Sequence, residues 1–155
     1  MDRNGETPKM IKACAVMMML ATPLLAGNAF AMGSSDSWSS EGTDLSAVTE
    51  LVDTGMYDIA IDKIETMLEE DPENADLYNY LAYSQRKMGD FDSAAQNYER
   101  ALMIDPEHVG ALEYQGELFL QTGKPELAQE NLARLQQLCG MDCEEYKTLA
   151  SSITN

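Results

Sequence analysis

The chain has 155 residues, which is enough for one folded domain. It carries 27 acidic and 10 basic residues, so its formal net charge of -17 argues against a basic face for nucleic acid or anionic lipid. Hydrophobic residues make up 45% of the chain, too many for a disordered acidic segment. The low content of glycine, proline and aromatic residues favours an all-α domain. The single histidine, His108, is expected to be a solvated turn residue.

Residues 1–31 have the pattern of a secretory signal peptide. Three basic residues precede an apolar run over 13–25, and small residues surround the predicted cleavage point after Ala31. The apolar run is shorter than the roughly 20 residues that a membrane-spanning helix needs, so cleavage is favoured over a retained membrane anchor. Met10 is an alternative to Met1 as the start, because it begins a compact basic segment of its own. We therefore expect an exported protein, located in a bacterial periplasm.

Residues 32–43 form a serine-rich segment without a periodic apolar face, which predicts a flexible linker. The segment contains the only tryptophan of the chain, Trp38. Two interpretations of this side chain are open: it folds back on the first helix, or it is a docking residue for a partner.

From residue 41 onward the sequence repeats with a period of 34 residues. Three columns of glycine, alanine and bulky apolar residues show this spacing: Gly55, Gly89 and Gly123; Ala60, Ala94 and Ala128; Ile64, Tyr98 and Leu132. Glycine lets the chain leave a helix through a left-handed turn, alanine lets two helices approach closely, and the bulky residues fill the space between helices. An Asp-Pro pair at 71–72 recurs at 105–106, where proline ends one unit and begins the turn into the next.

The periodicity predicts an all-α fold: an α-solenoid of three helix-turn-helix repeats, followed by a C-terminal capping helix within 141–155. The seven expected helices cover about 44–54, 57–70, 75–88, 91–104, 109–121, 125–138 and 143–153. On the last helix, Tyr146, Leu149 and Ile153 form an apolar stripe. We expect this stripe to cover the exposed end of the third repeat.

These columns resemble the tetratricopeptide repeat family. The second unit, residues 75–108, matches its consensus at Tyr78, Leu81, Ala82, Gly89, Phe91, Ala94, Tyr98, Ala101 and Pro106. The third unit, 109–140, has Gly140 in place of the proline, and the first unit, 41–74, has Asp44 and Ala47 where large apolar residues are usual. The resemblance covers residues 41–140. It implies the solenoid fold, but it does not point to one particular function.

In the resembled family, the first helix of each unit lines a concave groove that holds a segment of a peptide or protein. The matching positions here are Thr49, Asp53, Asp76, Asn79, Tyr80, Tyr83, Arg86, Lys87, Glu113, Tyr114, Glu117 and Gln121. Three tyrosines among polar groups are typical of a binding surface, because each offers a large contact area for little loss of entropy. The alternative interpretation is that Tyr80 or Tyr83 simply packs between units.

Cys139 and Cys143 are the only cysteines downstream of the predicted cleavage point. In an oxidising compartment we expect them to form a disulfide that attaches the last helix to the third repeat. A redox-active pair is one alternative, although such pairs usually have two intervening residues rather than three. A metal site is the other, but the sequence shows no further ligand, since His108 lies in a distant turn.

The sequence thus predicts an exported protein without catalytic activity or cofactor, which acts as an adaptor or assembly factor by binding a protein segment in the groove. Asp76, Glu113 and Glu117 favour a basic or neutral segment and faster association with it. Two other hypotheses remain: thiol-disulfide or metal handling through Cys139 and Cys143, and self-association into a homo-oligomer. The sequence contains no phosphate-binding glycine loop, no Gly-x-Ser-x-Gly motif and no His-Glu-x-x-His motif.

Overall fold

A computed structural model describes residues 43–154 of the chain. These residues belong to one structural unit, Trp38–Asn155. The predicted signal peptide and residues 32–42 of the predicted linker, with Trp38, lie outside the described residues. The described part is helical, and none of its helices is both long and apolar enough to cross a membrane.

The described residues form seven helices, as the 34-residue period predicts. They are α1 (Ser46–Asp53), α2 (Tyr57–Glu70), α3 (Ala75–Met88), α4 (Phe91–Ile104), α5 (Val109–Gln121), α6 (Pro125–Leu138) and α7 (Glu144–Thr154). The largest difference from the predicted bounds is at α1, which begins two residues later than expected. Asp44 precedes that helix, and its carboxylate accepts a hydrogen bond of 3.0 Å from the backbone N–H of Ser46.

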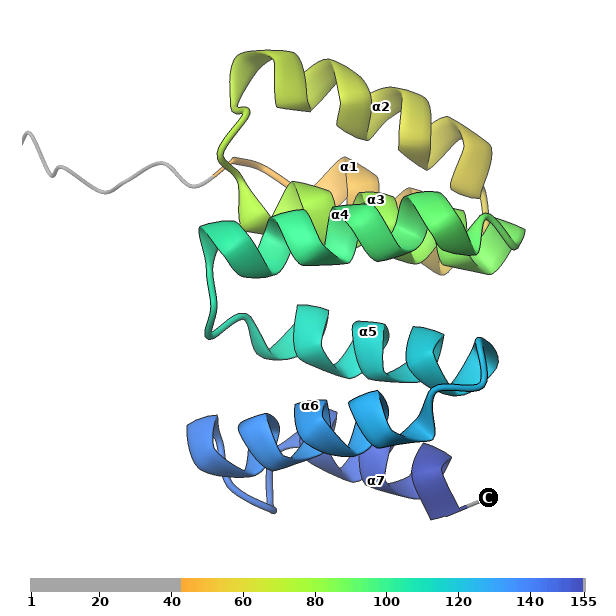
Figure 1. The fold of residues 1–155 in the computed structure, drawn as a ribbon. Coiled ribbons are helices and arrows are strands. Elements are labelled where there is room, and N and C mark those ends of the chain that lie inside the picture. Colours follow the sequence, from red (N-terminus) through yellow and green to blue (C-terminus); the bar gives the residue numbers. More distant parts are fainter. Residues whose placement is uncertain (1–42, 155) are drawn as a thin grey trace, which may run out of the picture. The chain divides into compact units, whose positions relative to one another are not determined.

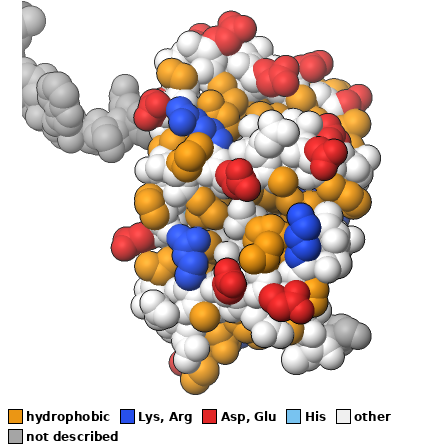
Figure 2. Space-filling model, viewed as in Figure 1, with side chains coloured by type: hydrophobic (Ala, Val, Ile, Leu, Met, Phe, Trp, Pro, Cys, Tyr) orange, Lys and Arg blue, Asp and Glu red, His pale blue; other side chains and the backbone are white. Residues whose placement is uncertain are grey.

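The helices form two rows (Figure 1). In the inner row, α1 contacts α3, α3 contacts α5, and α5 contacts α7. In the outer row, α2, α4 and α6 each pack on inner helices, and no two of these three have Cα atoms within 8 Å of each other. This arrangement confirms the predicted α-solenoid of three helix pairs with a further C-terminal helix. Figure 2, seen from the same side, shows acidic side chains spread over the visible face and few basic ones.

The glycine column occupies the turns between the two helices of each pair, as predicted. Gly55, Gly89 and Gly123 have φ angles of 76°, 87° and 72°, in the left-handed region that side chains with a Cβ rarely adopt. At the end of α3, the N–H of Gly89 donates to the carbonyl of Arg86, and the N–H of Asp90 donates to that of Gln85. These bonds close the helix and turn the chain back into α4.

His108 is not the solvated turn residue that the sequence predicted. Its side chain is only 12% exposed, and Nδ1 accepts a hydrogen bond of 3.2 Å from the backbone N–H of Ala111 at the start of α5. Because Nδ1 acts as the acceptor, the ring proton is on Nε2, which donates to a carboxylate oxygen of Asp76 at 3.1 Å. His108 therefore caps α5 and connects it to α3, a role that composition alone does not reveal.

The C-terminal helix closes the end of the solenoid through a close contact with α5. Leu149 is fully buried with Leu112 and Leu135, and Tyr146 and Ile153 pack against this cluster. A methyl group added at Gly116 would lie 2.6 Å from a side-chain carbon of Leu149, so glycine is what allows this approach. Helix α7 also stays in the 34-residue register, since Tyr146 follows Leu112 by one period. It therefore stands where the first helix of a fourth repeat would begin.

Candidate functional site

The inner row of helices contains a cavity that is lined by tyrosines. The cavity has a volume of about 230 Å³ and is lined by Thr49, Val52, Asp53, Tyr80, Tyr83 and Tyr114. Its lining comes from α1, α3 and α5, so all three repeats contribute to it. We call it the tyrosine cavity. Of the twelve residues that sequence reasoning placed in a groove, the structure brings five together at this point.

The three tyrosines combine packing between repeats with exposure to the cavity. The rings of Tyr83 in α3 and Tyr114 in α5 have centroids 4.9 Å apart, and Tyr57 meets Tyr83 edge-on at 6.2 Å. Burial, followed by the neighbouring charge of Glu113, raises the pKa of Tyr114 to about 12. Burial also raises the pKa of Tyr83. Their hydroxyls therefore stay protonated at physiological pH and can both donate and accept hydrogen bonds.

Arg86 lies beneath the surface rather than on it. Its side chain is 3% exposed, and its guanidinium is 2.8 Å from the carboxylate of Glu117 in α5. It also donates to the hydroxyl of Tyr98 and to the side-chain oxygen of Gln121, each at 3.4 Å. Burial by itself lowers the pKa of Arg86, but Tyr98 and Glu117 raise it by more, so the side chain stays charged. This network joins α3, α4 and α5.

Two cations lie close to the ring of Tyr83. The guanidinium carbon of Arg86 is 5.3 Å from the ring centroid, and the ammonium of Lys87 is 5.8 Å from it. Arg86 is also 5.9 Å from the ring of Tyr114. Such cation–π contacts help to hold the aromatic rings in place. Lys87 is exposed, so of the two cations it is the one that a ligand can reach.

Three other predicted groove residues differ widely in exposure. Asp76 is exposed at the rim, where it accepts the hydrogen bond from His108. Asn79 is 4% exposed, and its side-chain oxygen has no hydrogen-bond partner among the described residues. Glu113 is 8% exposed, and burial is the main cause that raises its pKa to about 7. Asn79 and Glu113 are thus mostly enclosed by protein at the groove, instead of standing open on its surface.

Sequence reasoning assigned the last helix only to capping, but the structure also gives it a place on the inner face. A second cavity of about 330 Å³ is lined by Glu117, Leu120 and Gln121 of α5 and by Ser152 of α7. Glu144 and Glu145, in the first turn of α7, both act on the pKa of Glu113. The register of α7 with the three repeats is the signal that could have identified these residues.

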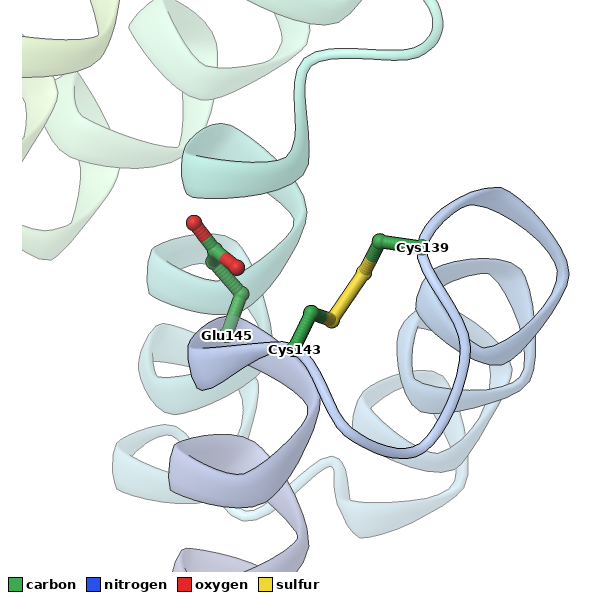
Figure 3. A group of neighbouring side chains, drawn as sticks. All are labelled: Cys139, Cys143 and Glu145. Atoms are coloured by element: carbon green, nitrogen blue, oxygen red, sulfur yellow. A yellow bond between two sulfur atoms is a disulfide. The ribbon is translucent and has the colours of Figure 1, made fainter.

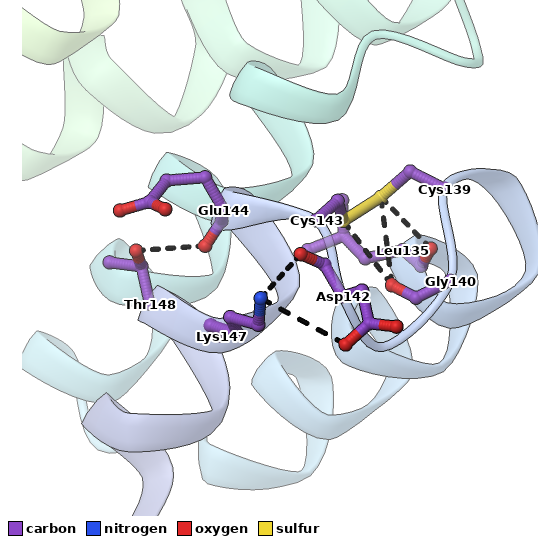
Figure 4. Close-up of a disulfide and its surroundings, with 8 residues drawn as sticks. All are labelled: Leu135, Cys139, Gly140, Asp142, Cys143, Glu144, Lys147 and Thr148. Atoms are coloured by element: carbon purple, nitrogen blue, oxygen red, sulfur yellow. Dashed lines mark hydrogen bonds and ion pairs between the residues drawn. A yellow bond between two sulfur atoms is a disulfide. The ribbon is translucent and has the colours of Figure 1, made fainter.

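Cys139 and Cys143 are joined in the loop between α6 and α7 (Figure 4). Their Cα atoms are 5.8 Å apart, within the usual range for a disulfide. The sulfur of Cys143 lies 3.3 Å from the carbonyl oxygen of Gly140, and Lys147 donates a hydrogen bond to the carbonyl of Asp142. The link spans the point where the third repeat ends and α7 begins.

Glu145 adds a carboxylate to this cysteine pair (Figure 3). One oxygen of Glu145 and the two sulfur atoms lie within 4.8 Å of one another. The sequence had indicated no such third group. While Cys139 and Cys143 are bonded to each other, neither offers the thiolate that a metal ligand or nucleophile requires. The arrangement is therefore that of a structural link next to an acidic side chain.

Comparison with known proteins agrees with this architecture. A sequence profile of the tetratricopeptide repeat matches residues 75–108, which are α3, α4 and the turns that follow them. No curated protein has a sequence similar enough to be matched to this chain.

Three solved structures of a Yersinia enterocolitica protein, the type III secretion translocator chaperone SycD, have a similar fold. One is 22% identical, with a TM-score of 0.61, and covers 70% of this chain and 82% of that one. A second, SycD in complex with a peptide of the translocator YopD, is 21% identical, with a TM-score of 0.60 and the same coverage. A third is 21% identical and covers 70% of this chain and 74% of that one, with a TM-score of 0.61. One helix pair of the chain thus matches the tetratricopeptide repeat, and the fold of the described residues is similar to that of SycD.

Proposed function

We propose that the protein is a non-catalytic adaptor or assembly factor that binds a segment of another protein along its inner face. The observation that carries this proposal is the tyrosine cavity, in which Tyr80, Tyr83 and Tyr114 from two repeats line one hollow with Asp53. Amphipathic rings with hydroxyl groups can contact apolar side chains and main-chain polar groups of a bound segment.

The similar structures support the same proposal. One of the three SycD structures holds a peptide of a translocator, so a protein with this fold can accommodate a peptide segment. We infer the same kind of occupant here, a segment from a partner protein. The adaptor role needs no cofactor, because binding alone accounts for it.

The charge of the inner face supports a basic or neutral segment. Asp53, Asp76 and Glu144 are exposed on inner helices, while Lys87 is an exposed cation among them. An excess of carboxylates attracts a basic segment and speeds its association, and salt screens this attraction. Binding should therefore weaken as sodium chloride is raised from 50 mM to 500 mM; an affinity unchanged by salt would contradict the electrostatic part.

We further propose that the protein acts in the bacterial periplasm, after removal of residues 1–31. The pattern of those residues and the cysteine pair of the mature chain support this. Cell fractionation with N-terminal sequencing tests the location: a periplasmic form that begins at Met32 is expected. A protein found intact in the cytoplasm would contradict the proposal.

The decisive test of the groove is affinity capture from the native cell, with the protein as bait. A variant with Tyr80, Tyr83 and Tyr114 changed to alanine should lose a partner that the wild type retains. Tyr78→Ala is the matched control, because that ring lies under Arg100 and not in the tyrosine cavity. Circular dichroism establishes that both variants remain helical. Capture of the same set of proteins by all three baits would rule out the groove.

Self-association is a second candidate, supported by exposed apolar residues beside the intra-repeat turns. These residues are Met56, Ile59, Met88, Phe91 and Leu127. One of the similar SycD structures is an alternative dimer, which shows that a protein of this fold can pair with itself. Light scattering over a concentration series distinguishes the two candidates, since a monomer at all concentrations excludes self-association.

A further inference from the structure

Glu113 is a buried carboxyl group without a partner. Its side chain is 8% exposed, and it makes no hydrogen bond or ion pair with any of the residues 43–154. Among the side-chain nitrogen and oxygen atoms of these residues, the oxygen of Asn79 is the only fully buried one that lacks a partner. Both carboxylate oxygens of Glu113 therefore keep some contact with solvent. The group is thus enclosed by protein on most sides but can be reached from outside.

Glu113 lies between the two cavities of the inner face. The next residue on α5, Tyr114, lines the tyrosine cavity. Glu117, one helical turn further along, lines the second cavity. A segment that runs along the inner face from one cavity to the other would therefore pass Glu113.

The charges around Glu113 are mostly negative. Glu117 on its own helix and Glu144 and Glu145 on α7 all disfavour its ionised form, while Arg86 on α3 favours it. Arg86 is already paired with Glu117 at 2.8 Å, so it cannot serve as a full counterion for the others.

The other two helices that pack against α5 bring no cation to Glu113. From α4, Tyr98 directs its hydroxyl to Arg86. From α6, the neutral side chain of Asn131 donates to the carbonyl of Leu112 and to the side chain of Gln115. The local charge is therefore left unbalanced.

Because of this environment, Glu113 titrates near neutral pH. Burial is the largest cause that raises its pKa to about 7, and the repulsion from Glu117 and Glu145 follows. A cation placed against the carboxylate would restore the ionised form and add a charge-assisted hydrogen bond.

We propose that Glu113, flanked by Glu144 and Glu145, receives the side chain of a lysine or arginine from the bound segment. This inference rests on the proposed peptide-binding function and gives that function a specificity-determining position. A basic side chain fits because it is long enough to reach an enclosed carboxylate and carries the missing positive charge. An acidic or short neutral side chain at the same position would leave Glu113 uncompensated.

The proposal has a consequence for pH dependence. If the segment binds only the ionised form of Glu113, the fraction of competent protein falls from about nine-tenths at pH 8 to about one-tenth at pH 6. The dissociation constant of a lysine-containing peptide should therefore rise about tenfold over this range. In Glu113→Gln the pH dependence should disappear, because the amide does not titrate.

The test is selection of 12-residue peptides from a random displayed library. The bait is the protein in its proposed exported form, residues 32–155. Wild type and Glu130→Gln, which removes an exposed carboxylate on α6, should both enrich peptides with lysine or arginine at one fixed position. Glu113→Gln should enrich peptides without this preference. An unchanged preference for a basic residue in Glu113→Gln would overturn the inference, as would enriched peptides that have no basic position.

Two further arms separate the other outcomes. The first arm measures binding of the selected peptides to a variant with both Tyr83→Ala and Tyr114→Ala. If every peptide binds this variant as well as the wild type, the proposed function itself fails, and this inference fails with it. If calcium alone raises the melting temperature of the wild type but not of Glu113→Gln, the carboxylates hold a metal cation, and the basic side chain is excluded as their ligand. Selection that succeeds on wild type while the preference persists in Glu113→Gln leaves the groove standing and removes only the role of Glu113.

Discussion

Arg86 of α3 and Glu117 of α5 form an ion pair of 2.8 Å that connects the second repeat to the third. The pair lies beneath the tyrosines of the inner face, and the same guanidinium is within 6 Å of the ring centroids of Tyr83 and Tyr114. The side chain of Arg86 is almost fully enclosed, whereas that of Glu117 is 26% exposed. The contact therefore helps to position the tyrosines of the inner face.

Replacing Arg86 by methionine should destabilise the protein by about 3 kcal/mol, because Glu117 and the hydroxyl of Tyr98 lose their partner in a desolvated site. Urea unfolding followed by circular dichroism measures the change. Glu73→Gln is the control, since it breaks the exposed pair with Arg100 and should cost less than about 1 kcal/mol. Equal losses in both variants would show that burial of the Arg86 pair is without effect.

Gly116→Val should loosen the contact between α5 and α7. The added side chain meets Leu149 at less than 3 Å, and such overpacking costs about 1–3 kcal/mol. The same substitution in a Leu149→Ala background should cost less, because the cavity left by leucine accepts the new methyl groups. Urea unfolding of the four proteins gives the coupling between the sites. Additive losses would mean that the two side chains do not compete for space.

The contribution of Glu113 to the free energy of unfolding should decrease as pH rises. Its folded-state pKa of about 7 lies above the value of an unfolded chain, so the folded state binds more protons between about pH 4.5 and 7. Stability from this group is therefore fully present below pH 4.5 and is lost as pH rises through 7. Glu113→Gln should match the wild type at pH 4 and exceed it by about 1–3 kcal/mol at pH 8.

The free energy of unfolding between pH 4 and pH 8 measures this difference. Glu130→Gln serves as the control, since its carboxylate is exposed on α6 and its removal should not change the slope. If Glu113→Gln follows the wild-type curve at every pH, the carboxyl group is not desolvated in the folded protein.

His108→Ala should cost about 1 kcal/mol, because the first turn of α5 loses the side chain that accepts from the N–H of Ala111. His108→Asn should retain most of the stability, since asparagine is among the preferred capping residues. Thermal unfolding of both variants is the measurement. A similar loss in His108→Asn would assign the effect to the contact with Asp76 instead of the cap.

Reduction of the cysteine pair should cost about 2 kcal/mol, the chain-entropy effect of opening so short a loop. Cys139→Ser with Cys143→Ser should unfold at the same urea concentration with and without reductant, whereas the wild type should shift. Thiol titration of the native protein should find no free thiol at Cys139 or Cys143. Reactive thiols in the untreated protein would favour the redox or metal-handling hypothesis over a structural link.

The helices could be predicted from sequence because each position of the repeat has one dominant physical role. Ala60, Ala94 and Ala128 are fully buried, as expected for residues that let two helices approach. The same columns could not show which polar groove positions face outward. Arg86 occupies such a position, and only the contacts with Glu117 and Tyr98 determine that it is buried.

The role of the C-terminal helix shows a second limit of sequence reasoning. The stripe of Tyr146, Leu149 and Ile153 was sufficient to predict that this helix covers the end of the third repeat. Its polar residues carry no such pattern, because carboxylates are frequent throughout this acidic chain. That Glu144 and Glu145 act on Glu113 follows from the packing of α7 against α5.

The separation of the outer helices determines how the solenoid can bend. Because α2, α4 and α6 have no Cα atoms within 8 Å of one another, each is linked to the next repeat mainly through that repeat's inner helix: α2 packs on α3, α4 on α5, and α6 on α7. The curvature therefore depends on these contacts together with those of α1 with α3, α3 with α5, and α5 with α7. A small rotation of the second repeat relative to the third, at the contact between α3 and α5, would therefore widen or narrow the inner face.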